Sequence, residues 1–195
     1  MKKLLSLLAV VVFFTTTVIA KQVTLLMDWF PQGNQSGYWQ AEFDNRYHTD
    51  VTIKVKAGGP KVNTTTAVAS GQVEFGLQAS DSVMLANAKG AGLKGIFVSL
   101  DHVPYTLVYH PNTGVNSVKD LDGRPFAVKM GVTYWKWVKH TYGLNNVKEF
   151  PLTGDLGLFA RTPQQFQQGY SLFLPARLDA KGVANEQITV ESLGY

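Results

Sequence analysis

Apolar stretches alternate with turn-forming residues along most of this chain. Residues 23–27 (Val, Thr, Leu, Leu, Met) are too apolar to alternate, which predicts a strand buried on both faces. Residues 51–56 alternate apolar and polar side chains and also predict a strand. Between them, the chain passes through a Pro/Gly loop into residues 38–47, where we expect a helix. This strand–loop–helix order predicts an α/β unit.

The same alternation continues to the end of the chain. We expect further strands at residues 73–78, 96–100, 105–109, 125–129, 147–150, 170–173 and 188–191. We expect helices from Asn63 or Thr64 to Ser70 and at residues 82–89, 133–142, 163–168 and 175–181. This order predicts an α/β fold of mostly parallel sheets flanked by helices. A crossing between residues 100 and 105 predicts two lobes, residues 21–102 and 103–195.

The first twenty residues are typical of a cleavable secretory signal. Lys2 and Lys3 precede an apolar run at residues 4–14, and Ala20 ends a small-residue cleavage site. The run is too short to span a bilayer. The sequence contains no cysteine, which excludes a lipid anchor on cysteine and disulfides. We therefore expect a soluble periplasmic protein; the alternative is an uncleaved anchor, against which Ala20 argues.

Charge and histidine spacing exclude several function classes. The net charge of +4 includes two lysines of the signal, and the other basic residues are scattered, so we expect no nucleic-acid partner. The four histidines share no metal-binding spacing; they are His48, His102, His110 and His140. No nucleophile or phosphate-loop motif occurs. We expect no metal, no cofactor and no catalytic residue.

The loop after the first strand is the best candidate for a ligand contact. Asp28, Trp29, Asn34 and Gln35 combine an aromatic ring with hydrogen-bonding groups. In parallel sheets, ligands bind beyond the carboxyl ends of the strands, where this loop should lie. The alternative is that Trp29 covers the core, which is the commoner role for such a ring.

Three predicted helix starts should point at the same region, at residues 58–63, 80–82 and 131–134. Their free N–H groups can bind an anionic or polar ligand, which makes Gly59, Ser80 and Asp81 candidates. Ser80 and Asp81 could instead only cap their helix.

Tyr134 and Trp135 follow the third of these starts. We expect Tyr134 or Trp135 to oppose Trp29 across a cleft and hold a flat ring. At least one aromatic residue of this helix should belong to the core.

Four phrases of the chain carry a resemblance. They are Asp28-Trp29-Phe30-Pro31 with Gly37, Ala69 to Gly76, Ser117 to Arg124, and Gln167-Gln168-Gly169-Tyr170. In this order they resemble the periplasmic solute-binding proteins of ABC importers for nitrate, sulfonates and thiamine-pyrimidine precursors. The resemblance implies the two-lobed type II periplasmic binding architecture. It also implies capture of a small molecule, either a pyrimidine-like ring or a sulfonate- or nitrate-type anion, and a membrane permease as partner.

The chain departs from the family pattern at three places. Gln35 stands where the family has His, which removes an acid–base group. Leu174 stands where the family has Glu before Pro175, which removes a hydrogen-bond acceptor unless that step is structural. Family members usually continue beyond Gly194-Tyr195, so we expect an incomplete first lobe. The alternatives are a truncated, non-functional remnant and a pyrimidine-precursor synthase, whose Lys, His and cysteine cluster this chain does not match.

Overall fold

The computed structural model describes residues 21–44 and 50–195. The predicted signal (residues 1–20) and the end of the first predicted helix (residues 45–47) lie outside the described residues. Within the described ranges, no helix is both long and apolar enough to cross a bilayer.

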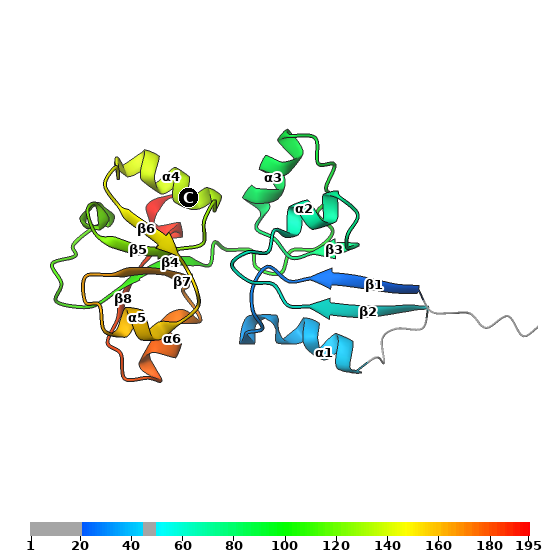
Figure 1. The fold of residues 1–195 in the computed structure, drawn as a ribbon, viewed down its shortest axis with the longest axis horizontal. Helices are drawn as coiled ribbons and strands as arrows, with labels where there is room; N and C mark the ends of the chain where they lie inside the picture. Colours follow the sequence, from blue (N-terminus) through cyan, green and yellow to red (C-terminus); the bar gives the residue numbers. More distant parts are fainter. Residues whose placement is uncertain (1–20, 45–49) are drawn as a thin grey trace, which may run out of the picture.

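The strands form two separate sheets, and each sheet with its helices forms one lobe (Figure 1). The first lobe contains β1 (Lys21–Leu26), the 3-10 helix η1 (Gly33–Gln35), α1 (Ser36–Asp44), β2 (Val51–Lys56), α2 (Thr64–Ala69), β3 (Phe75–Gly76) and α3 (Ser80–Ala88). The second lobe contains β4 (Tyr105–Tyr109), η2 (Val118–Leu121), β5 (Pro125–Val128), α4 (Thr133–Tyr142), β6 (Lys148–Pro151), α5 (Leu156–Ala160), β7 (Phe166–Tyr170), α6 (Leu174–Asp179), β8 (Glu186–Thr189) and η3 (Glu191–Leu193).

The sheet of the first lobe is parallel, in the order β2-β1-β3. The central strand β1 buries Val23 and is followed by the fully buried Met27, but Thr24, Leu25 and Leu26 keep some exposure. The expectation that this strand is buried on both faces is therefore only partly right. A sheet of three short strands is too narrow to be fully covered on both sides.

The sheet of the second lobe has the order β6-β5-β7-β4-β8. β5 is parallel to β6 and β7, whereas β4 is antiparallel to β7 and β8. Successive residues of β4 face opposite cores: Leu107 packs with the side chains of α4, and Val108 packs with those of α5 and α6. α4 therefore covers one face of the sheet, and α5 and α6 cover the other (Figure 1). The predicted α/β class with sheets flanked by helices is confirmed, but the second sheet is mixed where mostly parallel sheets were expected.

Three predicted segments are wrong: the strands at residues 96–100 and 170–173 and the helix at residues 163–168. Of residues 170–173, only Tyr170 belongs to a strand, and the next three residues form a turn. Residues 96–100 form no strand, and Ile96, Phe97 and Val98 are 72–76% exposed. No strand among the described residues lies beside this segment to accept its hydrogen bonds. Residues 163–168 were expected as a helix, but β7 begins at Phe166 and fills the space between β5 and β4. A central strand with buried Gln167 and Gln168 has no apolar alternation to reveal it.

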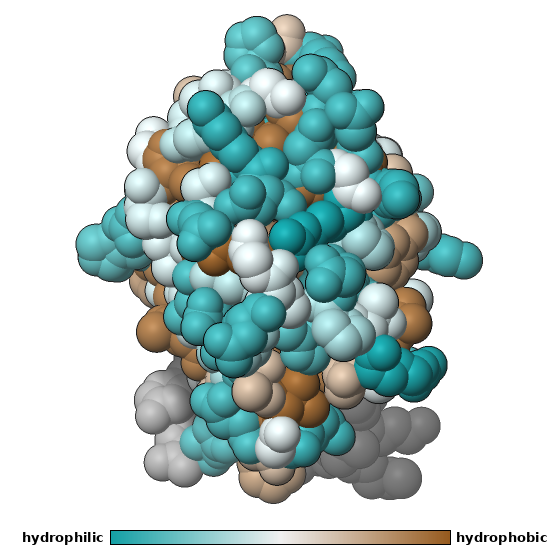
Figure 2. Space-filling view, turned by 90° about the vertical axis from the view of Figure 1, so that its left-hand side faces the viewer, coloured by the Kyte–Doolittle hydropathy of each residue, from teal (hydrophilic) through white to brown (hydrophobic). Residues whose placement is uncertain are grey.

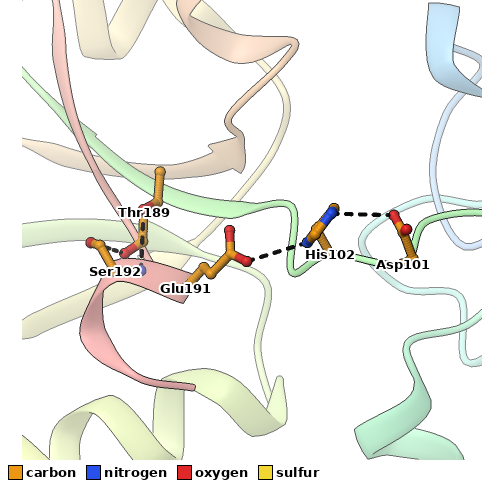
Figure 3. A network of polar contacts seen from close by, with 5 residues as sticks. All are labelled: Asp101, His102, Thr189, Glu191 and Ser192. Atoms are coloured by element: carbon orange, nitrogen blue, oxygen red, sulfur yellow. Dashed lines mark hydrogen bonds and ion pairs between the residues drawn. The ribbon is translucent and has the colours of Figure 1, made fainter.

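The segment between the lobes runs past η3 of the second lobe (Figure 3). The His102 ring lies 3.4 Å from the Glu191 carboxylate and 3.7 Å from Asp101. All three side chains are well exposed, so these contacts add little to stability. The outer side of the second lobe shows apolar residues as separate patches among polar ones (Figure 2).

Gly58 is where the two loops at the end of β1 and β2 touch. A Cβ atom at Gly58 would lie 2.1 Å from the Met27 carbonyl oxygen and 2.6 Å from the Trp29 nitrogen, and neither backbone atom can move aside. We expect Gly58→Ala to lower the free energy of unfolding by about 3 kcal/mol, measured by denaturant titration.

The matched control is Gly37→Ala. Gly37 lies in α1 with nothing within 4 Å of an added Cβ, so this change should leave stability unchanged or raise it slightly. Equal effects of the two changes would contradict the role of Gly58.

Candidate functional site

A cleft of about 530 Å³ lies between the lobes and is lined by both. We call it the inter-lobe cleft. The first lobe contributes the loop after β1 and parts of α2 and α3, and the second contributes the loop between β5 and α4, the end of β7 and the start of α6. The carboxyl ends of parallel strands meet at one edge of each sheet, and these edges face each other here.

Asp28 and Trp29, directly after β1, both line the cleft. The Asp28 carboxylate accepts hydrogen bonds from Gln35 Nε2 (3.1 Å) and from the Tyr170 hydroxyl of the second lobe (3.3 Å). Lys129 Nζ donates to the Asp28 carbonyl oxygen (3.2 Å) and lies 5.5 Å from the centroid of the Trp29 ring. Two side chains of the second lobe therefore hold this loop.

Gln35 and Asn34 do not line the cleft. Gln35 lies in η1, is 1% exposed and donates to Asp28, so it supports a cleft residue from behind. Asn34 is exposed on the same turn. Asn34 and Gln35 are neighbours, yet only Gln35 faces inward. The amino-acid composition of the loop cannot reveal which of two neighbouring amides does so.

Of the three candidates at predicted helix starts, only Asp81 lines the cleft. Gly59 is buried against the Phe30 ring and Ser80 is exposed, and neither lines the cleft. Asp81 does, and its carboxylate accepts a 2.6 Å hydrogen bond from the Tyr195 hydroxyl of the other lobe. The expected capping by Ser80 or Asp81 is wrong, because α3 begins at Ser80 and the extended Ala79 takes the cap position.

Tyr134 lines the cleft but is fully buried, with its ring stacked on Tyr105 at 4.4 Å between centroids. Trp135, 3% exposed, lies in the core against Phe126 and does not line the cleft. The expectation that Trp135 opposes Trp29 is therefore wrong. The 100° turn between successive helical residues sends Trp135 into the core of the lobe.

Lys129, Tyr170 and Tyr105 line the cleft and were missed from sequence. Lys129 directly follows β5, as Asp28 follows β1, so the rule that selected Asp28 could have selected it. Tyr170 ends a strand whose position was mispredicted. No sequence signal places Tyr105, which is at the start of β4.

Burial dominates the electrostatics of this region. Desolvation raises the pKa of Asp28, although Lys129 and the Tyr170 hydroxyl pull the other way. Desolvation also lowers the pKa of Lys129, against the attraction of Asp28. The pKa values of Tyr105 and Tyr170 are raised by burial and by the nearby carboxylates. Burial thus disfavours the charged form of both Asp28 and Lys129, and the attraction between the two charges offsets part of this desolvation free energy.

Leu174 forms part of an apolar wall of the cleft with Leu152, Leu156 and Phe173. It is 5% exposed and packs directly over Gly169, where an added Cβ would lie 2.3 Å from Leu174 Cδ2. Sequence comparison alone left open whether the residue before Pro175 is structural. In this chain it is a core residue.

The described part of the chain contains no cluster of three or more His, Cys, Asp or Glu side chains that could hold a metal. Of the histidines in these residues, none lines the cleft. His48 lies outside the described residues.

Comparisons with known proteins agree with this architecture. The profile of the NMT1/THI5-like family matches residues 34–145. A 4-amino-5-hydroxymethyl-2-methylpyrimidine phosphate synthase of Legionella pneumophila is 26% identical over 114 residues, which cover 54% of this chain and 34% of that protein. The match therefore spans about a third of that relative's length.

Solved structures share the fold at low identity. The aliphatic sulphonate binding protein SsuA of Escherichia coli has a TM-score of 0.55 and 14% identity, with 87% of this chain and 56% of that chain covered. The alkanesulfonate-binding protein SsuA of Xanthomonas axonopodis pv. citri, bound to MOPS, has a TM-score of 0.61 and 16% identity, with coverage of 89% and 62%. A putative L-cystine ABC transporter protein of Listeria monocytogenes has a TM-score of 0.61 and 15% identity, with coverage of 87% and 78%.

The raised pKa of Asp28 predicts a pH dependence of stability. The unfolded chain protonates Asp28 near 3.8, whereas the folded protein does so at higher pH. The contribution of Asp28 to the free energy of unfolding should therefore increase as the pH falls from neutral through its folded pKa. Asp28→Asn should remove this increase, as measured by denaturant unfolding at a series of pH values.

Asp120 is the control of opposite sign. Backbone N–H groups of Asn116 and Ser117 lower its pKa, so its stabilisation should be lost as the pH falls through its folded pKa. Asp120→Asn should flatten the acid side of the profile. The same response from both variants would contradict the assignment for Asp28.

Proposed function

Because this chain belongs to the NMT1/THI5-like family, whose profile matches residues 34–145, we propose that it is the substrate-binding protein of an ABC-type importer. It captures a small molecule between its two lobes and is not an enzyme. The lobes are residues 21–102 and 103–195. The family resemblance predicted from the four sequence phrases is confirmed by this match.

One observation carries the proposal: both lobes line the inter-lobe cleft. Trp29 comes from the first lobe and Tyr134 from the second, and the volume of about 530 Å³ suits a small organic molecule. Movement of the lobes about the connecting segment would open and close such a site. The site residues we propose as ligand contacts are Trp29 and Asp81, and the fully buried Tyr134 supports the wall of the cleft behind Tyr105.

The side chains of the cleft favour a ligand with an anionic group and an apolar or flat part. The cationic side chains that line it are Lys61, Lys89, Lys129, Lys136 and Arg177, against the carboxylates of Asp28 and Asp81. Asp28 and Asp81 already accept hydrogen bonds from tyrosines, so they have less capacity to bind a cationic ligand. The apolar wall formed by Leu174 and its neighbours would contact the apolar part of such a ligand. A sulfonate fits this description, as does an acidic derivative of a pyrimidine ring.

The partner and the location follow from the same proposal. A substrate-binding protein of this type passes its ligand to a membrane permease and works in the periplasm. The predicted secretory signal at residues 1–20 supports this location. We expect no nucleic-acid partner and no cofactor.

The named function of the Legionella relative raises the alternative of a pyrimidine-precursor synthase. Three features favour binding over synthesis: Gln35 in place of the family His, its side chain directed at Asp28, and a sequence with no cysteine. An amide cannot act as a general acid or base near neutral pH, whereas a histidine can.

Calorimetric titration tests the proposal. We expect binding of at least one ligand among taurine, longer alkanesulfonates, MOPS, nitrate and hydroxymethylpyrimidine derivatives. Trp29→Ala should weaken that binding by about tenfold, because it removes an aromatic contact. Mass spectrometry should recover the ligand unchanged after prolonged incubation.

Asn34→Ala is the control, since Asn34 is exposed and lies outside the cleft. It should bind as the wild type does. A folded sample that binds none of these ligands would count against the ligand classes, and a chemically converted ligand would contradict a purely binding function.

A further inference from the structure

Asp28 and Lys129 are opposite charges that reach the same point from different lobes. Asp28 lies two residues after the end of β1, and Lys129 directly follows β5. The Lys129 ammonium donates to the Asp28 carbonyl oxygen at 3.2 Å. Both residues are partly buried in the cleft, so opening of the lobes would return both charges to water.

We propose that Asp28 and Lys129 are a matched charge pair that allows the lobes to close, and that neither residue serves mainly as a ligand contact. This inference rests on the closing motion of the proposed function, but not on any particular ligand. A single charge left in the closed cleft would be uncompensated, which strongly disfavours burial. Two opposite charges, or none, can be enclosed at much lower cost.

Gln35 and Tyr170 are the positioning residues of this pair. Gln35 Nε2 donates to Asp28 Oδ1 (3.1 Å) from within the first lobe, and the Tyr170 hydroxyl donates to Oδ2 (3.3 Å) from the second. Each carboxylate oxygen thus accepts one hydrogen bond, which fixes the side chain, while the Lys129 ammonium contacts the main chain of the same residue. The Trp29 ring, 5.5 Å from the ammonium, adds a cation–π contact on the same side.

The other titratable groups near the pair come from the second lobe and from the walls of the cleft. Tyr170 on β7 and Tyr105 on β4 face Asp28, and burial raises the pKa of both, so they stay neutral. The remaining charged side chains of the cleft are Lys61, Lys89, Lys136, Arg177 and Asp81. Asp28 and Asp81 are the two carboxylates that line the cleft. An experiment in acid must therefore distinguish the protonation of Asp28 from that of Asp81.

The distance between the lobes can be measured without any ligand. The sequence contains no cysteine, so Gln40→Cys on α1 and Lys181→Cys after α6 provide two unique, exposed sites for spin labels. α1 and α6 belong to different lobes and lie on the same side of the molecule (Figure 1). Pulsed electron–electron double resonance then measures the distribution of distances between the two labels, and hence of open and closed forms. The samples are the labelled protein without further change, Asp28→Asn, Lys129→Met and the double variant.

We expect each single variant to lower the ratio of closed to open form by about tenfold at neutral pH, and the double variant to restore it. Lys129→Met should close again in acid, because protonation removes the charge of Asp28, whereas Asp28→Asn should not. Repeating the acid series with Asp81→Asn present removes the contribution of the second carboxylate. Lys136→Met, an exposed cation of the same cleft, is the matched control and should behave as the wild type does.

The proposal is overturned if the single variants keep the wild-type distances, if the double variant is as open as the single ones, or if the wild type shows no closed form. Circular dichroism on the same samples checks that each variant is folded. Failure to bind any ligand leaves these distances unaffected, so it would count against the proposed function and not against the charge pair.

Discussion

The close approach of two backbones at Gly58 is the constraint on which the site depends. β1 is the central strand of its sheet, and the chain leaves it at the fully buried Met27. The Met27 nitrogen donates to the Lys56 carbonyl, and the Gly58 nitrogen donates to the Trp29 carbonyl (2.9 and 3.0 Å). These bonds hold the loops after β1 and β2 together where any side chain would collide with the backbone. Asp28 and Trp29 are therefore directed into the cleft by main-chain contacts.

Elements with strong local signals could be predicted from sequence. α4 matches its expected range, because Gly131 precedes it and Gly143 ends it in the left-handed conformation that glycine accepts readily. β2 and β4 also match, since their residues fit a strand. β7 could not be predicted, because its buried Gln167 and Gln168 are polar and are held by tertiary contacts. The Gln168 side chain, for example, accepts a 2.7 Å hydrogen bond from the backbone N–H of Lys129.

The site was predictable in location but not in its individual contacts. The rule that ligands bind beyond the carboxyl ends of strands found the loop of Asp28 and Trp29 and the start of α4. Which side chains enter the cleft depends on helix rotation and on strand order, and neither is encoded locally. Trp135 faces the core for the first reason, and Tyr170 meets Asp28 for the second, because β7 lies between β5 and β4.

The contacts of Asp28 also bear on Gln35, which stands where the family resemblance implies a His. A general base needs an oxygen that is free to meet a proton of the ligand. Here one carboxylate oxygen accepts from Gln35 and the other from Tyr170, and Lys129 holds the backbone of the same residue. An amide at position 35 donates one hydrogen bond at every pH, whereas a histidine would donate or accept according to its protonation. The amide at position 35 therefore holds the Asp28 side chain in the same position at every pH, which the proposed closure would require.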